Sequence, residues 1–266
     1  MLSAGLAKRS SKGNLIDRFR NRLLIPLHDA QGRVVGYTGR LLVEQGEKTG
    51  PKYLNSPETP IYKKSEILFG YHLAKRSMRQ EDAAIVVEGN LDVIASYKTG
   101  VTHVVASSGT ALTQNQLTLL HKQTNHLLMC FDSDSAGFAA AQRGIRLAQT
   151  MGFDVDVISI PDELGKDTDD VVQKDPLAWQ QLVEQPIPVM RYYIDRWSHT
   201  LDVSDSRSKR DFAKLVLSEL VYIKDAVERQ HWLQMVADIT GTDVNVLRSS
   251  IQPIETITSG SRGYNT

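Results

Sequence analysis

The chain has 266 residues, of which 41% are hydrophobic and 23% are charged, and its formal net charge at pH 7 is zero. This is the composition of an ordinary soluble protein that can bury a core in two or three subdomains. No apolar run approaches the roughly 20 residues of a membrane-spanning helix, and no signal-peptide core follows Met1, so we expect a cytoplasmic protein without membrane contact. The single cysteine, Cys130, excludes an internal disulfide and a cysteine zinc site, and its apolar surroundings predict a buried thiol.

Charge is unevenly divided along the chain. Residues 1–80 contain 15 Lys and Arg against 6 Asp and Glu, whereas the remainder contains 16 against 25. A basic segment of this kind suits the phosphates of a nucleic acid or of nucleotides. Within it, residues 17–27 and 33–40 flank the turn residues 29–32, a pattern that predicts a β-hairpin. We therefore expect a basic α+β subdomain over residues 1–80.

Further along, apolar runs are followed three times by carboxylates. The runs are residues 83–87, 127–131 and 155–160, and each has the length and branched side chains of a strand buried on both faces of a parallel sheet. The carboxylates that follow them are Glu88 and Asp92, then Asp132 and Asp134, then Asp167, Asp169 and Asp170.

Helical patterns fill the gaps between these runs. They cover residues 91–97, 117–123 and 136–150, and Thr113 with Gln116 forms a capping-box signature before the second. Strands that alternate with helices predict a doubly wound parallel sheet, flanked by helices, over residues 81–180. Ligands of such sheets bind beyond the carboxyl ends of the strands, so the carboxylates should share one site.

A cluster of carboxylates needs a cation to offset its repulsion. Oxygen ligands without nearby His or Cys favour Mg²⁺ or Mn²⁺, and the implied chemistry is phosphoryl or nucleotidyl transfer. Each acidic residue taken singly is also a common solvated turn former.

After a break at residues 184–188 the pattern becomes helical again. Residues 212–223 and 227–239 carry apolar side chains at the helical period, the second stripe through Val227, His231, Met235 and Ile239. They predict a helical bundle over residues 181–252. Trp179, Trp197 and Trp232 are interpreted as core or interface anchors rather than as base-stacking residues. The polar, Gly/Ser-rich tail at residues 253–266 is predicted to be disordered.

The order Glu88-Gly89-x-x-Asp92 and Asp132-x-Asp134-x-Ala136-Gly137 resembles a Toprim domain. The surrounding sequences VVEGNLDVIASYKTGVTHVVASSGTALT, CFDSDSAGFAAAQR and GKDTDD are similar to bacterial DNA primases of the DnaG type. This resemblance runs from about Gly5 to about Ser250. Two positions depart from the family pattern: Asn90, where an aromatic residue is usual, and Thr168, where proline is usual.

The basic segment also resembles that family, through DRFRNRLLIPLHDAQGRVVGYTGR and PKYLNSPETPIYKK. By motif position, Arg40, Lys52 and Lys64 match residues that contact template or nucleotide there, and Lys166 is a further candidate. Without this context each would be read as an ordinary surface cation.

The resemblance implies a DNA-dependent RNA polymerase that makes short primers on single-stranded DNA from ribonucleoside triphosphates, leaving an RNA–DNA hybrid. It implies two or three Mg²⁺ ions, or Mn²⁺, and no zinc in this chain. Their implied ligands are Asp132, Asp134, Asp167 and Asp169, with Asp92 in support. Glu88 is either a metal ligand or a general base, and a monomer is expected.

Two alternatives stay open at this point: a Toprim nuclease or topoisomerase, and a truncated fragment that binds DNA without synthesis. Tyr192 and Tyr193 have no recognisable DNA-cleavage context. Met1 falls inside the family's basic subdomain, and the family's zinc module and helicase-interacting domain are expected to lie outside this chain. Contact with a replicative helicase is therefore expected only through a domain that is absent here. An isolated fragment, a truncated gene product and half of a split primase are all compatible with the sequence.

Overall fold

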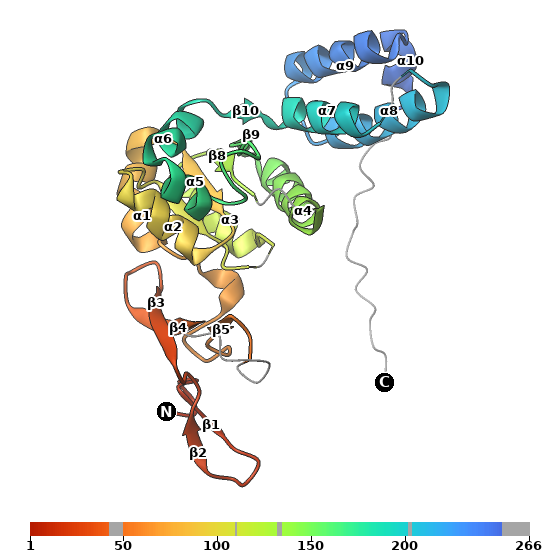
Figure 1. The fold of residues 1–266 in the computed structure, drawn as a ribbon. Helices are drawn as coiled ribbons and strands as arrows, with labels where there is room; N and C mark the ends of the chain where they lie inside the picture. The colour runs from red at the N-terminus through yellow and green to blue at the C-terminus, as the bar shows by residue number, and fades with distance from the viewer. Residues whose placement is uncertain (43–49, 110, 132–134, 202–203, 252–266) are drawn as a thin grey trace, which may run out of the picture. The chain divides into compact units, whose positions relative to one another are not determined.

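The structure is a computed structural model that describes residues 1–42, 50–109, 111–131, 135–201 and 204–251. Asp132, Asp134 and the tail predicted at residues 253–266 lie outside these residues. The chain divides into two compact units, Met1–Ile187 and Pro188–Thr266 (Figure 1). None of the described helices is long and apolar enough to cross a membrane.

The first unit begins with two antiparallel sheets. The smaller pairs β1 (Ala7–Arg9) with β2 (Leu15–Asp17), and the larger has the order β3 (Arg22–His28), β4 (Val34–Leu41), β5 (Tyr53–Asn55). The predicted hairpin is confirmed as β3 and β4. Its turn is closed by Asp29, whose Oδ1 accepts hydrogen bonds from the backbone N–H groups of Gln31 and Arg33 at 2.9 and 3.0 Å.

A mostly parallel sheet forms the core of the first unit. Its order is β10 (Ile187–Pro188), β9 (Asp154–Val157), β8 (His126–Met129), β6 (Ala84–Val87), β7 (Val104–Ala106), and the three pairings among β6 to β9 are parallel. The three strands predicted from apolar runs are therefore confirmed as β6, β8 and β9. β7 was not predicted, because a run of three apolar residues is too short to show a strand pattern.

Helices cover both faces of this sheet (Figure 1). Along the buried strands, alternate side chains point to opposite faces. Ile85 and Leu128 belong to the apolar cluster that holds Trp179, whereas Leu127 and Met129 lie on the other face. The helices are α1 (Tyr71–Glu81), α2 (Asn90–Lys98), α3 (Gln114–His121), α4 (Ser135–Met151), α5 (Thr168–Lys174) and α6 (Pro176–Glu184), with a short 3₁₀ helix η2 (Lys64–Glu66) before them. Cys130 is buried in this cluster, as predicted.

The predicted capping box opens α3. Thr113 Oγ1 accepts from the Gln116 N–H at 3.2 Å, and Gln116 Oε1 accepts from the Thr113 N–H at 3.0 Å. The Gln116 amide nitrogen also donates to the carbonyls of Lys64 and Ile67 at 3.2 and 2.8 Å. Fully buried, Gln116 thus ties α3 to the segment that carries η2.

The second unit consists of α7 (Val189–Thr200), α8 (Ser206–Leu220), α9 (Ala226–Thr240) and α10 (Val244–Ser249). Trp197 and Trp232 are buried in it, as predicted, and Tyr193 stacks on Trp197 with ring centroids 5.0 Å apart. The apolar stripe predicted for α9 is wrong. Val227 is 80% exposed, and the buried stripe is Trp232, Leu233, Val236, Ala237 and Thr240.

The hairpin turn packs against α1 through two histidines. The rings of His28 and His72 lie 4.3 Å apart between centroids, and Lys75 Nζ donates to the carbonyl of Ala30 at 2.7 Å. Burial lowers the pKa of His72, and the electrostatic effects of His28 and Lys75 lower it further, against the opposing effect of Asp29. The contact therefore favours the neutral imidazole.

We expect Gln116→Ala to lower the free energy of unfolding by about 2–4 kcal/mol, because the variant loses one cap and leaves two carbonyls without their donor. Gln114→Ala removes an exposed glutamine from the same helix and serves as the control. Urea unfolding of both variants measures the difference. If Gln116→Ala and Gln114→Ala had the same free energy of unfolding, the buried amide of Gln116 would make no net contribution to stability.

The His28–His72 contact predicts a pH dependence. Because the folded pKa of His72 lies below the unfolded value of about 6.5, its contribution to stability is present above that pH and is lost as the pH falls through the folded pKa. His72→Gln should therefore lose less stability than the wild type between about pH 6.5 and pH 5. Unfolding measured across this range tests the prediction, with the exposed His199→Gln as control. Parallel curves for wild type and His72→Gln would contradict it.

Candidate metal and nucleotide cleft

A cleft of about 530 Å³ opens at the carboxyl edge of the parallel sheet. One wall comes from the antiparallel sheet and contains Thr38, Arg40, Lys52, Tyr53 and Asn55. The other wall follows β6 and enters α2 and α5, and its acidic residues are Glu88, Asp92, Asp167, Asp169 and Asp170. Cations and carboxylates therefore occupy opposite walls of one cleft.

Asp92 is the most enclosed of these carboxylates, with 7% of its surface exposed. Its Oδ2 accepts from the Gly89 N–H at 2.9 Å, which caps α2. A Cβ at Gly89 would stand 2.7 Å from that oxygen, so only glycine lets the carboxylate approach its backbone. Its Oδ1 accepts from the Asp169 N–H at 3.2 Å. Asp92 thus joins the loop after β6 to the start of α5.

Asp167 shapes the start of α5. Its Oδ1 accepts from the Asp170 N–H at 2.8 Å as the N-cap of the helix. Asp170 Oδ2 in turn accepts from the Lys166 N–H at 3.1 Å. Gly165, at φ +142, packs so closely on Asp170 that a Cβ would collide with it. The turn of residues 165–170 therefore presents Asp167 and Asp169 to the cleft from a fixed backbone.

The donor chemistry of this wall fits a hard divalent cation. Asp167 Oδ1 accepts from a backbone N–H and Asp169 Oδ2 from the side chain of Gln173, so each carboxylate keeps a second oxygen for a ligand. Carboxylate oxygens of this kind suit Mg²⁺ or Mn²⁺. Within the described residues, no three His, Cys, Asp or Glu side chains are close enough to form a ready-made metal site. Asp132 and Asp134, the other expected ligands, lie outside those residues.

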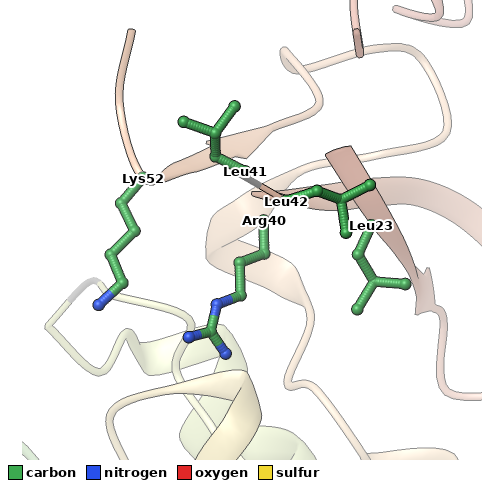
Figure 2. Close-up of a pocket in the computed structure, with 5 residues that line it drawn as sticks. All are labelled: Leu23, Arg40, Leu41, Leu42 and Lys52. Atoms are coloured by element: carbon green, nitrogen blue, oxygen red, sulfur yellow. The ribbon is translucent and has the colours of Figure 1, made fainter. Parts of the chain in front are cut away.

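The cationic wall is built on β4 and on the residues around β5. Figure 2 shows Arg40 and Lys52 extending from the sheet in the same direction, next to the exposed side chains of Leu23 and Leu42. Arg40 Cζ lies 6.0 Å from the centre of the Tyr53 ring. Burial is the main cause that raises the pKa of Tyr53. The carboxylates of the acidic wall raise it further, whereas the charge of Arg40 lowers it.

Arg22 fixes the backbone that carries Lys52. Its guanidinium donates to the carbonyls of Gly39, Lys52 and Pro51 at 2.9, 3.2 and 2.7 Å. The arginine at the start of β3 therefore holds together the ends of β4 and β5. Among the described residues, Arg40 and Lys52 form no ion pair with a carboxylate, so both charges remain available to a ligand.

The structure brings together six of the residues expected from the sequence: Arg40, Lys52, Glu88, Asp92, Asp167 and Asp169. Among the described residues, the side chains of Lys64 and Lys166 do not line this cleft; Lys64 lies in η2 and Lys166 is exposed in the turn before α5. Their roles stay predictions.

The cleft also contains residues that sequence reasoning missed, among them Tyr53, Asn55 and Gln173. Tyr53 and Asn55 lie inside the same KYLNS motif as Lys52, so that motif was the available signal. Asn90, which departs from the family pattern, accepts a hydrogen bond from Ser108 Oγ at 2.6 Å. Ser108 has φ +59, an unusual value for a residue other than glycine, and it lines the cleft beside Glu88.

Known proteins match the chain along most of its length. Residues 1–75 match the N-terminal domain of the DNA primase catalytic core, and residues 85–172 match the Toprim-like family. The DNA primase of Clostridium acetobutylicum is 38% identical over 242 residues, which cover 91% of this chain. They cover 39% of the relative, so the chain spans about two fifths of that protein's length.

Solved structures match as well. A DNA primase domain from Pseudomonas aeruginosa has a TM-score of 0.77 at 32% identity, covering 94% of this chain and 78% of that one. The DnaG primase catalytic domain bound to single-stranded DNA has a TM-score of 0.76 at 31% identity, covering 92% and 76%.

The parallel sheet, its carboxylate cleft and the matched region define a Toprim protein, a class whose domain typically binds divalent metal ions. A basic subdomain of the primase type precedes that domain in the same order as in the matching structures. The chain belongs to the family of DnaG-type DNA primase catalytic cores.

Asp92→Asn should weaken both the fold and the cleft. Asparagine offers one acceptor oxygen where the carboxylate offers two, so one of the two backbone donors loses its partner. We expect a loss of about 1–3 kcal/mol in the free energy of unfolding. Mg²⁺ affinity should fall about tenfold, as for other outer-shell partners. Urea unfolding and metal titration measure the two effects, with the exposed Asp162→Asn as control. If neither the free energy of unfolding nor the Mg²⁺ affinity changed, Asp92 would not be holding the loop after β6 to the start of α5.

Proposed function

We propose that this chain catalyses DNA-templated synthesis of short RNA primers by nucleotidyl transfer. The observation that supports the proposal best is the two-walled cleft, where Arg40 and Lys52 stand opposite Glu88, Asp92, Asp167 and Asp169. A nucleoside triphosphate carries phosphates that need cations, and it binds divalent metal that needs carboxylates. Such a substrate satisfies both walls at once.

In the proposed reaction, the 3′-hydroxyl of one ribonucleotide attacks the α-phosphate of the next and pyrophosphate leaves. Arg40 and Lys52 offset the negative charge of the phosphates, and their position on the braced ends of β4 and β5 fixes where the phosphates lie. Asp167 and Asp169, together with Asp132 and Asp134, would hold two or three Mg²⁺ or Mn²⁺ ions. When bound, these ions supply charge stabilisation to the phosphate and activate the attacking hydroxyl.

Glu88 has two candidate roles in this scheme. It follows β6 directly and lines the cleft, where its carboxylate can ligate a metal or accept the proton of the attacking hydroxyl. Arg40 packs on Tyr53, so a cation and an aromatic face are held together. That pair suits a nucleotide, whose phosphate and base need both kinds of contact.

The proposed template is single-stranded DNA, the ligand named for the similar DnaG catalytic domain. The proposed substrates are ribonucleoside triphosphates and the product is an RNA–DNA hybrid, made by a monomer. Primer synthesis during replication would place the chain in the bacterial cytoplasm. Contact with a replicative helicase would need a part of the whole primase beyond the two fifths spanned here. Family membership favours this reaction over DNA cleavage.

A primer assay tests the proposal and its cations. The purified chain, with Mg²⁺, ribonucleoside triphosphates and a single-stranded oligonucleotide, should yield dinucleotides and short RNAs on a sequencing gel. Lys52→Ala should reduce product severalfold because a cation of the cleft is lost, and Lys64→Ala should do so because its motif position predicts a template or nucleotide contact. Thermal stability of both should stay within about 0.5 kcal/mol. Lys122→Ala, an exposed lysine at the end of α3, is the control.

Absence of product from the wild type would contradict the proposal. If the wild type instead cleaved the DNA, the nuclease alternative would replace it; if it bound DNA without making RNA, the non-catalytic alternative would. Full activity of Lys64→Ala would remove that lysine from the site.

A further inference from the structure

Gln173 is a neutral side chain of the cleft lining that hydrogen-bonds a carboxylate of the acidic wall. It is exposed on α5, four residues after Asp169, so the two side chains lie on the same face of the helix. Its amide nitrogen donates to Asp169 Oδ2 at 2.9 Å. This bond occupies one oxygen of the carboxylate and leaves Oδ1 for another ligand.

Further hydrogen bonds connect Asp169 through Asp92 to the loop after β6. The Asp169 N–H donates to Asp92 Oδ1 at 3.2 Å, and Asp92 Oδ2 accepts from the Gly89 N–H at 2.9 Å, next to Glu88. Asp169 is therefore held at its backbone by Asp92 and at its side chain by Gln173. These two contacts restrict rotation about the side-chain bonds of Asp169 before a ligand binds. The entropic cost of binding that ligand is therefore lower.

The neutrality of the amide matters as much as its position. A lysine or arginine four residues after Asp169 would form an ion pair with it on the helix. That cation would compete with a divalent metal for the same carboxylate, whereas an amide donates a hydrogen bond and leaves the negative charge intact.

We propose that Gln173 is a positioning residue for metal binding: it orients the Asp169 carboxylate so that Oδ1 is the oxygen offered to a divalent cation. This inference rests on the proposed function, because it concerns the metal ions of that same cleft. It assigns a role to a residue that the carboxylate pattern of the sequence does not include.

The test measures metal affinity directly, by calorimetric titration of Mg²⁺ and Mn²⁺ into the wild type, Gln173→Ala and Gln173→Lys. We expect Gln173→Ala to bind about tenfold more weakly, as when other outer-shell partners are removed. Gln173→Lys should bind more weakly still, because its ammonium competes for Asp169. Gln181→Ala, an exposed glutamine on α6 outside the cleft lining, should bind as the wild type does.

A second readout separates positioning from chemistry. In the primer assay, Gln173→Ala should need about ten times more Mg²⁺ for half-maximal rate, and should approach the wild-type rate once Mg²⁺ saturates. Circular dichroism should show unchanged folding, since Gln173 is exposed.

Three outcomes would overturn the inference. Equal affinities of wild type and Gln173→Ala would show that the amide positions nothing, and a Gln173→Lys variant that binds as tightly as the wild type would refute the argument from neutrality. If the wild type bound neither Mg²⁺ nor Mn²⁺, the proposed metal-dependent function would be wrong, and this inference would be wrong with it. The first two results leave the proposed function standing, so the failures are distinguishable.

Discussion

Repulsion among carboxylates at one edge of the parallel sheet is the constraint that the cleft must meet. Several ionised groups placed within one site raise each other's free energy unless donors or cations compensate them. Part of the compensation comes from backbone N–H groups, which donate to Asp92 from two sides and to Asp167 from the first turn of α5. Such charge-assisted bonds stabilise each anion without adding a competing charge. The acidic wall is thereby ordered before any ligand binds.

The assembly of the first unit determines where the acidic wall and the cationic wall lie. The strands β6 to β9 run parallel, so their carboxyl ends lie at one edge of the sheet, and Glu88 follows β6 directly at that edge. The opposing wall belongs to a different sheet and must be held in place by contacts between subdomains. Gln116 donates to the segment around η2, Lys75 to the hairpin turn, and Phe69 pairs with Ala106 of β7. These contacts, together with Phe69, which packs against the apolar clusters of both subdomains, position the cationic wall.

Prediction from sequence succeeded where the signal is local and repeated. Largely apolar runs of five or six residues marked β6, β8 and β9, and the cap of α3 follows from two residues three positions apart. It failed where tertiary packing decides: β7 is too short to carry a pattern, and the stripe of α9 is shifted by one residue toward Trp232. The tether from Gln116 to the segment around η2 joins residues that no spacing rule specifies. The bond from Gln173 to Asp169 follows the i, i+4 spacing of a helix, but the sequence reasoning considered only the carboxylates of that turn. Motif position alone named Lys64, which lies outside the described cleft lining.

Opposite charges that face each other without pairing constrain what the cleft can bind. Two unit charges 4 Å apart attract by about 4 kcal/mol at an effective dielectric of about 20, so an arginine free to reach a carboxylate would collapse onto it. In the described cleft the Arg40 guanidinium instead lies 6.0 Å from the centre of the Tyr53 ring, and Arg22 fixes the backbone at Lys52 by donating to its carbonyl. Among the described residues, neither Arg40 nor Lys52 forms an ion pair with the acidic wall. A simple anion would satisfy only the cations, and a metal ion only the carboxylates. A polyphosphate that brings divalent metal with it would satisfy both, which is why the proposed substrate is a nucleoside triphosphate.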